Sequence, residues 1–201
     1  MILSRQRLFQ LVFLVVAILS LDVLTKYLVH EHVSHRMWAL PMYPYGGIPV
    51  CKNLLGIDLV ISHVTNEGGP WGVVSSHHTS LVLFRVFAIG CLIAHLLFFN
   101  KIPFREVPLA MIIAGAVGNV LDSFFYGHVI DMIHCVFWGY SFPVFNIADM
   151  TICSGVAVML IHACVQKWKE RRPKPVAPVN SSAPMYQEDP FSFDKIDHHG
   201  P

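Results

Sequence analysis

Charged residues are scarce in this sequence. Asp, Glu, Lys and Arg together make up 13% of the 201 residues, whereas a soluble domain carries about 25%. Hydrophobic residues reach 54% and the mean hydropathy is +0.54, so the composition excludes a water-soluble core and indicates a protein that lies in lipid. The formal net charge is only +1, which gives no indication of nucleic-acid binding.

Cysteine motifs are missing as well. The five cysteines show no C-x-x-C spacing and no zinc signature. Cys91, Cys153 and Cys164 lie in apolar runs, where cysteine behaves as a small hydrophobic residue. Cys51 and Cys135 fall in connections that we expect on the same side of the membrane, so a disulfide between them stays open.

Four apolar stretches approach the roughly 20 residues that a transmembrane helix needs. They cover about residues 8–29, 81–99, 107–125 and 147–165. The first could be a signal peptide, because Arg5 and Arg7 precede it, but it is long and lacks a small-x-small cleavage site. We therefore interpret it as an anchor and predict an α-helical integral membrane protein with four transmembrane helices.

Lysine and arginine are unevenly distributed between the connections. They gather before the first span, between the second and third, and after the fourth, at Arg5, Arg7, Lys101, Arg105, Lys167, Lys169, Arg171, Arg172 and Lys174. Segments 30–80 and 126–146 are poorer in positive charge. Because cytoplasmic loops carry the excess of positive charge, both termini are predicted to be cytoplasmic and these two segments to face the outer side.

The predicted domain organisation is a four-span membrane unit over residues 1–166 and a cytoplasmic tail over 167–201. Segment 30–80 is too long for a plain connector and contains a β-like run at Gly56–Val64, so we expect a small extramembrane β-cradle in this first outer loop. Residues Asn66–Gly72 have the composition of a turn. The tail is basic and then rich in Pro and polar residues, which predicts disorder.

Polar side chains inside or at the ends of spans are costly, so each is a functional hypothesis. Asp22 and Lys26 are four residues apart on one helix face and can form a structural ion pair. Asn119 and Asp122 also share a face, where hydrogen bonding between helices competes with a chemical role.

Asn146 fits a helix N-cap, with Asp149 three residues later at the positive end of the helix dipole. A capping role for Asp149 is therefore the simplest interpretation when the motif is taken alone. Asp131, just beyond the third span, could equally be an ordinary loop residue.

The predicted topology brings these polar residues to one membrane surface, the outer one. They are Asp22, Asn66, Asn119, Asp122, Asp131, Asn146 and Asp149. Two carboxylates that meet in a poorly solvated site cannot easily both ionise. One can then act as a base toward water while the other, protonated, acts as an acid. This is the arrangement of aspartic proteases, and it needs no metal, no cofactor and no nucleophilic side chain.

Several short motifs in this chain resemble those of one family. They are Asp22–Lys26 (DVLTK), Asn66–Gly68 (NEG), Gly115–Asp122 (GAVGNVLD), Val129–Asp131 (VID) and Phe145–Asp149 (FNIAD). Their order and spacing resemble lipoprotein signal peptidase, also called signal peptidase II, a family of four-span bacterial membrane aspartyl proteases. The resemblance covers roughly residues 8–166.

The resemblance implies roles for these residues. Asp131 and Asp149 would form the catalytic dyad, and Asn66, Asn119 and Asn146 would position the dyad and the substrate. Asp22, Lys26 and Asp122 would support the site.

The resemblance also implies a substrate and a location. The substrate would be a prolipoprotein whose lipobox cysteine carries diacylglycerol, cut just before that cysteine. The enzyme would lie in the bacterial inner membrane with its site near the outer, periplasmic face and segment 30–80 folded over it as a cradle and amphipathic helix. Its contacts would be substrate and membrane lipid, globomycin-type peptides would inhibit it, and we expect a monomer.

The chain departs from the family pattern at two places. Ser123 stands where the family usually has an arginine that is thought to hold the substrate backbone or the site geometry. The outer-loop turn reads Gly69–Gly72 (GPWG), which keeps the usual aromatic residue but adds a proline. How the substrate is held therefore stays open.

Two other interpretations compete with a peptidase. A small transporter or proton relay could use Asp22, Asp122, Asp131 and Asp149, although these acids lie at one end of the bundle and no internal repeat is visible. A metal site could form from the H-x-H-x-x-H run, although this run has only Glu31 as an acidic neighbour. Its histidines are His30, His32 and His35.

Overall fold

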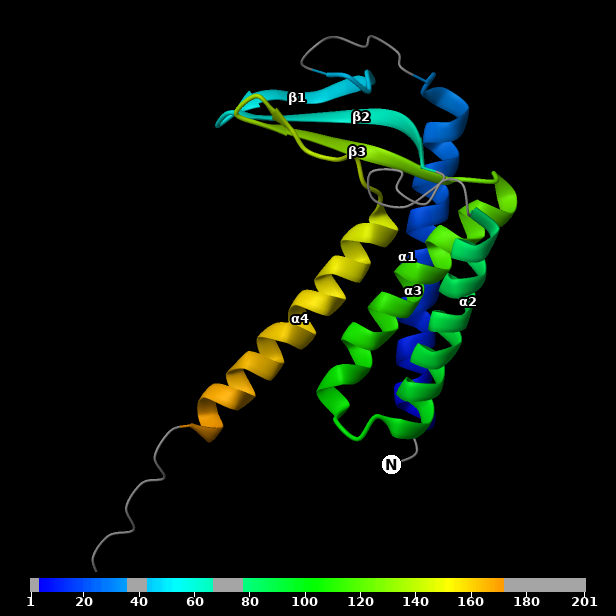
Figure 1. The fold of residues 1–201 in the computed structure, drawn as a ribbon, viewed down its shortest axis with the longest axis vertical. Coiled ribbons are helices and arrows are strands. Elements are labelled where there is room, and N and C mark those ends of the chain that lie inside the picture. Colours follow the sequence, from blue (N-terminus) through cyan, green and yellow to red (C-terminus); the bar gives the residue numbers. More distant parts are fainter. Residues whose placement is uncertain (1–3, 36–42, 67–77, 172–201) are drawn as a thin grey trace, which may run out of the picture.

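The computed structural model describes residues 4–35, 43–66 and 78–171 (Figure 1). The described residues contain four helices long and apolar enough to cross a membrane, which confirms the prediction of four spans. They are α1 (Arg5–His32), α2 (His78–Ala94), α3 (Glu106–Phe125) and α4 (Ile147–Glu170). A π-helical turn, η3 (His95–Phe99), continues α2, and a 3₁₀ turn, η4 (Pro103–Arg105), precedes α3.

Two of the helices are longer than the apolar stretches that predict them. The α1 helix has 28 residues, which correspond to about 42 Å against a hydrocarbon core of roughly 30 Å. It begins at Ser4, whose side chain accepts a hydrogen bond from the Arg7 N–H at 3.3 Å. The α4 helix continues to Glu170, past the expected end of the membrane unit at residue 166. Helical hydrogen bonding therefore extends beyond the apolar segment at these ends.

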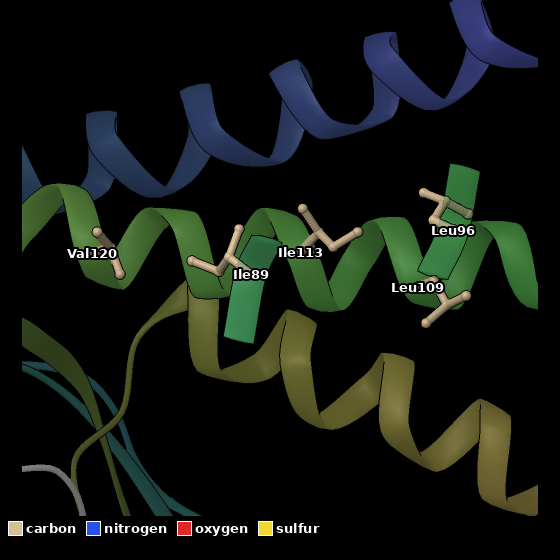
Figure 2. Close-up of a cluster of buried hydrophobic side chains, with 5 residues drawn as sticks. All are labelled: Ile89, Leu96, Leu109, Ile113 and Val120. Carbon is tan, nitrogen blue, oxygen red and sulfur yellow. The ribbon is translucent and has the colours of Figure 1, made fainter. Parts of the chain in front are cut away.

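Helix α3 is the centre of the bundle. Its most apolar window is 56% buried inside the protein, against 6–11% for the other three spans. Leu109, Ile113 and Val120 on α3 form a buried cluster with Ile89 of α2 and Leu96 of η3 (Figure 2). The outer faces of α1, α2 and α4 carry large exposed apolar side chains, as expected for helices surrounded by lipid.

The extramembrane part is a four-stranded antiparallel sheet in the order β1-β2-β3-β4. Its strands are β1 (Ile48–Leu54), β2 (Ile57–Asn66), β3 (Val129–Phe137) and β4 (Tyr140–Ser141). The sheet lies across the ends of the helices, on the side opposite the N-terminus (Figure 1).

The sheet confirms the expected cradle but draws on two outer connections. Strands β1 and β2 come from segment 30–80, whereas β3 and β4 come from segment 126–146. The sequence VIDMIHCVF of β3 is almost entirely buried or half-buried and lacks a polar face, so its pattern did not reveal a strand. The described residues 33–35 and 43–66 contain no helix. The Asn66–Gly72 turn beyond Asn66 and the tail after residue 171 lie outside the described residues.

The two extramembrane cysteines are free. Cys51 of β1 and Cys135 of β3 both pair with Leu59 of β2, one on each side of it. Two strand spacings separate them by about 10 Å, whereas a disulfide requires Cα atoms within roughly 7 Å. The disulfide that the sequence left open is therefore excluded by the strand order.

Candidate active site

Asp131 lies on β3, close to where this strand follows α3. Its side chain is buried and accepts two hydrogen bonds, from Asn66 Nδ2 at 3.1 Å and from Asn146 Nδ2 at 2.7 Å. Asn66 reaches Asp131 because β2 and β3 pair with Asn66 opposite Val129. In antiparallel strands such diagonal neighbours lie on the same face of the sheet.

Asp149 lies in the first turn of α4 and forms the capping box expected from the sequence. Its backbone N–H donates to Asn146 Oδ1 at 2.9 Å, and the Asn146 N–H donates to Asp149 Oδ2 at 3.4 Å. Its other carboxylate oxygen accepts from Asn119 Nδ2 of α3 at 2.8 Å. The carboxylate of Asp149 therefore both caps α4 and accepts a hydrogen bond from Asn119, so the cap is part of the polar site.

Asn146 connects the two carboxylates. It is fully buried, and its Nδ2 donates to Asp131 while its Oδ1 accepts from the Asp149 backbone. Its Nδ2 also lies 3.1 Å from Asn119 Oδ1. A side chain with both amide atoms committed holds its neighbours in a single arrangement.

A buried ionic network lies beside this pair of carboxylates. Lys26 Nζ is 2.7 Å from Asp22 Oδ2, 2.7 Å from Asp122 Oδ2 and 3.1 Å from Asn119 Oδ1. The pair between Asp22 and Lys26 was expected from their spacing, but its extension to α3 was not. The other oxygen of Asp22 accepts from the Ala148 N–H at 2.8 Å. The network thereby connects α1, α3 and the start of α4, and each buried charge has a partner.

Gly118 allows α1 to approach α3 at this network. A Cβ atom on Gly118 would lie 2.6 Å from Asp22 Oδ2, closer than real Cβ atoms approach an oxygen. Because a glycine has no side chain, the Asp22 carboxylate can lie against the helix backbone and reach Lys26.

A cavity of about 290 Å³ holds both carboxylates. Asp131 and Asp149 line it together with the polar side chains of Asn66, Asn119 and Arg85. The remaining lining is mostly apolar and comes from the start of β3, from the segment before α4 and from the first turns of α4. A mostly apolar cavity with a few convergent polar groups is typical of a ligand site.

The environment of Asp131 favours its protonated form. Burial and the neighbouring charge of Asp149 raise the pKa of Asp131 to about 7, against the lowering effect of the hydrogen bonds from Asn66 and Asn146. Near neutral pH Asp131 therefore carries a proton for part of the time, beside the carboxyl group of Asp149. Such a pair contains one group suited to accept a proton and one suited to donate a proton.

Arg85 is a cavity residue that the sequence did not place at the site. Its place near the start of a span suggests a side chain that extends to the membrane surface, but it lines the cavity instead. The cost of a charge several residues inside a span was the available signal. Ser123 does not line the cavity, and its hydroxyl donates to the Asn119 carbonyl on its own helix at 3.2 Å.

Two of the three histidines considered for a metal site meet at His63, and the third lies apart from them. The His30 and His35 rings contact His63 of β2, with centroids 5.5 and 3.8 Å away. His32 instead contacts the Leu28 carbonyl of α1 through its Nδ1 at 3.0 Å. Within residues 4–35, 43–66 and 78–171 no group of three His, Cys, Asp or Glu side chains could hold a metal ion. The metal interpretation has no support from this geometry.

Comparison with known proteins identifies the family. A sequence profile described as Signal peptidase (SPase) II matches residues 14–165. The chain belongs to the signal peptidase II family. A lipoprotein signal peptidase of Staphylococcus haemolyticus is 33% identical over 147 residues, which cover 71% of this chain and 89% of the relative. This family consists of bacterial membrane proteases, in agreement with the four spans described above.

Other matches differ in their coverage. A lipoprotein signal peptidase of Listeria monocytogenes is 27% identical over 158 residues, which cover 77% of this chain and 93% of the relative. That of Chlamydia pneumoniae is 39% identical over 103 residues, and this match covers 50% of this chain and 61% of the relative.

Solved structures show the same fold. Two bacterial membrane enzymes superpose with TM-scores of 0.66 and 0.62, each at 24% sequence identity. The superpositions cover 84% and 77% of this chain and 94% and 92% of the solved chains.

Proposed function

We propose that this chain is an aspartic endopeptidase that removes signal peptides from diacylglyceryl-modified prolipoproteins. The observation that carries the proposal is the meeting of Asp131 and Asp149 in one cavity, each held by asparagine amides. Family membership supports the peptidase activity and the lipoprotein substrate. The supporting residues are Asn66, Asn119, Asn146, Asp22, Lys26 and Asp122.

The chemistry follows from one shared proton. The ionised carboxylate accepts a proton from a water molecule as the water oxygen attacks the scissile carbonyl carbon. The protonated carboxyl group donates its proton to the carbonyl oxygen, which gives a neutral tetrahedral diol. When the C–N bond breaks, the first carboxyl group returns its proton to the leaving nitrogen and the second accepts one from the diol. The dyad is thereby restored to its starting protonation state.

The site lies where a lipid-anchored substrate can reach it. The cavity is lined by β3 of the extramembrane sheet and by the first turns of α4, so it lies at one end of the bundle rather than at its middle. A peptide attached to diacylglycerol presents its cleavage site close to the membrane surface. We propose that this end faces the periplasmic side of the bacterial inner membrane, that both termini are cytoplasmic and that the enzyme is a monomer.

A transporter or proton relay receives less support. A relay requires ionisable groups through the membrane midplane, whereas the acids described here gather at the end of the bundle next to the sheet. Asp22 and Asp122 are also engaged by Lys26 and by backbone N–H groups, which leaves them unsuited to carry protons.

Replacing each aspartate of the dyad with Asn tests the proposed function. We expect Asp131→Asn and Asp149→Asn each to lower kcat by about 100-fold or more, because each removes one proton-transfer group. The measurement is cleavage of a diacylated prolipoprotein by purified enzyme in detergent micelles.

A matched control is Asp58→Asn. Asp58 lies on β2 outside the cavity, where its two carboxylate oxygens accept hydrogen bonds from the Tyr43 hydroxyl and the Asn53 N–H. An Asn side chain has one acceptor oxygen and can keep one of these bonds, away from the dyad. The variant should retain the parental rate. Parental cleavage by either dyad variant would disprove the assignment, and a parent that never cleaves would favour a non-enzymatic function.

A further inference from the structure

Arg85 is a cationic side chain in the same cavity as the two carboxylates. It belongs to α2, about 10 Å along the helix axis from the first residue, His78. Arg85 lines the cavity, and its charge interacts with the negative charges of Asp149 and Asp131. It nevertheless forms no hydrogen bond or ion pair with any residue in the described part of the chain.

The asparagines of the site have no comparable capacity for a ligand. Asn119 donates to Asp149 and accepts from Lys26, and Asn146 donates to Asp131. These amides hold the catalytic carboxylates and are committed before a substrate arrives. A guanidinium has five N–H donors in a planar fork. None of these donors is used by a hydrogen bond to another described residue, so Arg85 can donate several hydrogen bonds to a ligand in the cavity.

Besides its hydrogen-bond donors, Arg85 brings a positive charge that can balance the dyad. The positive charge of Lys26 is already shared by Asp22 and Asp122. When the dyad carries one proton, it retains one negative charge, and Arg85 is the cationic side chain among the described cavity residues that can balance it. A cation held near a carboxylate but not bonded to it can donate to a substrate and still remain compensated.

We propose that Arg85 binds the substrate by donating hydrogen bonds to a backbone carbonyl oxygen of the peptide beside the scissile bond. The peptide would then be held between α2, which carries Arg85, and α4, which carries Asp149. This contact is made to the peptide backbone and not to a side chain, so it suits a peptidase whose substrates differ in sequence. This inference rests on the proposed function, because it requires a peptide substrate in the cavity.

The test compares Arg85→Gln and Arg85→Lys with the parent. We expect Arg85→Gln to raise KM for a synthetic diacylated lipopeptide by about tenfold or more, since hydrogen bonds to charged groups are the stronger ones, with a smaller change in kcat. Arg85→Lys should recover part of the loss, because it keeps the charge but not the planar fork. The control Lys101→Gln removes an exposed positive charge outside the cavity and should behave as the parent.

A carbonyl oxygen could also come from the glyceryl esters of the substrate. A second lipopeptide with ether-linked chains lacks these carbonyls. If Arg85 binds the peptide backbone, the rise in KM caused by Arg85→Gln persists with the ether substrate. If the rise disappears with it, Arg85 binds the lipid ester and the proposal is overturned.

Two further results decide the remaining cases. A parental KM for Arg85→Gln would overturn the proposal, as would a loss confined to kcat. If Arg85→Gln does not remain folded in a thermal unfolding assay, Arg85→Met, which removes the charge without adding a polar group, is judged by the same criteria. Failure of the proposed function is distinguishable, because it appears as an inactive parent or an active Asp131→Asn variant whatever Arg85 does.

Discussion

The buried aspartates Asp22, Asp122 and Asp131 are held in two different ways. Asp22 and Asp122 contact Lys26 directly, and each also accepts a backbone N–H. Asp131 receives only amide hydrogen bonds from Asn66 and Asn146 and lies beside the charge of Asp149. A buried carboxyl group without a bonded cation keeps its proton to higher pH, and this is the situation of Asp131.

This difference predicts a pH dependence of stability. The pKa of Asp131 is raised to about 7, so in the folded protein the group binds a proton more tightly than in the unfolded chain. Its favourable contribution is complete below the unfolded pKa, roughly 3.9, and is lost as pH rises through 7. We therefore expect the parent to lose stability relative to Asp131→Asn between pH 6 and pH 8, measured by thermal unfolding in detergent.

Asp58→Asn is the control for this measurement. The hydrogen bonds from Tyr43 and from the Asn53 N–H lower the pKa of Asp58, so its contribution is lost only as pH falls well below 6. It should not change the pH dependence between pH 6 and pH 8. Parallel stability curves for the parent and Asp131→Asn over that range would contradict the assignment of the raised pKa.

At the scale of elements, the site depends on how closely α3 packs against its neighbours. Residues of α3 contribute to the apolar cluster with α2 (Figure 2). They also contribute to the network around Lys26 and to the hydrogen bond with Asp149. Gly118 lies at the contact with α1, where the Asp22 carboxylate occupies the space of a side chain. A small shift between these helices would therefore move charged groups as well as apolar ones.

Gly118→Ala tests this close approach. The added methyl group would overlap the Asp22 carboxylate, and overpacking of this kind costs about 1–3 kcal/mol. We expect a lower midpoint of thermal unfolding in detergent and slower cleavage, because Asp22 also holds the Ala148 N–H at the start of α4.

Gly90→Ala provides a matched control on α2. A Cβ atom on Gly90 would meet nothing within 4 Å. Alanine is a better helix former than glycine by roughly 0.5–1 kcal/mol, so this variant should be as stable as the parent or slightly more stable. Equal unfolding midpoints for Gly118→Ala and the parent would show that α1 and α3 can separate without cost.

For the whole molecule, the sheet lies at one end of the bundle and the end of α4 lies at the other (Figure 1). The cavity is lined by residues of β3 and of the first turns of α4, so it belongs to the sheet end. The distribution of Lys and Arg predicts that the sheet end is periplasmic. Leu55, at the β1–β2 turn, is 86% exposed and belongs to the sheet end. Glu170 is exposed at the last residue of α4.

Cysteine labelling tests this orientation. In a variant without the native cysteines, Leu55→Cys should react with a membrane-impermeant maleimide on intact bacterial cells. Glu170→Cys should react only after the cells are permeabilised. The reverse pattern would place the cavity in the cytoplasm and contradict the proposed access of exported prolipoproteins.

The sequence alone determined those features that depend on neighbouring residues. The number of spans follows from continuous hydropathy, the pair of Asp22 and Lys26 from a spacing of four, and the cap formed by Asn146 and Asp149 from a spacing of three. The motifs also indicated the family, which the profile match confirms. Each of these needs only local geometry, because the helix repeat alone fixes which side chains meet.

Only the tertiary structure decided the contacts between distant segments. The pairing of β2 with β3 brought Asn66 to Asp131 and separated Cys51 from Cys135 by a whole strand. The packing of α1 against α3 brought Lys26 into contact with Asp122. The packing of α2 placed Arg85 at the cavity. Such contacts depend on strand register and on the rotation of one helix against another, which hydropathy and spacing along a single segment do not contain.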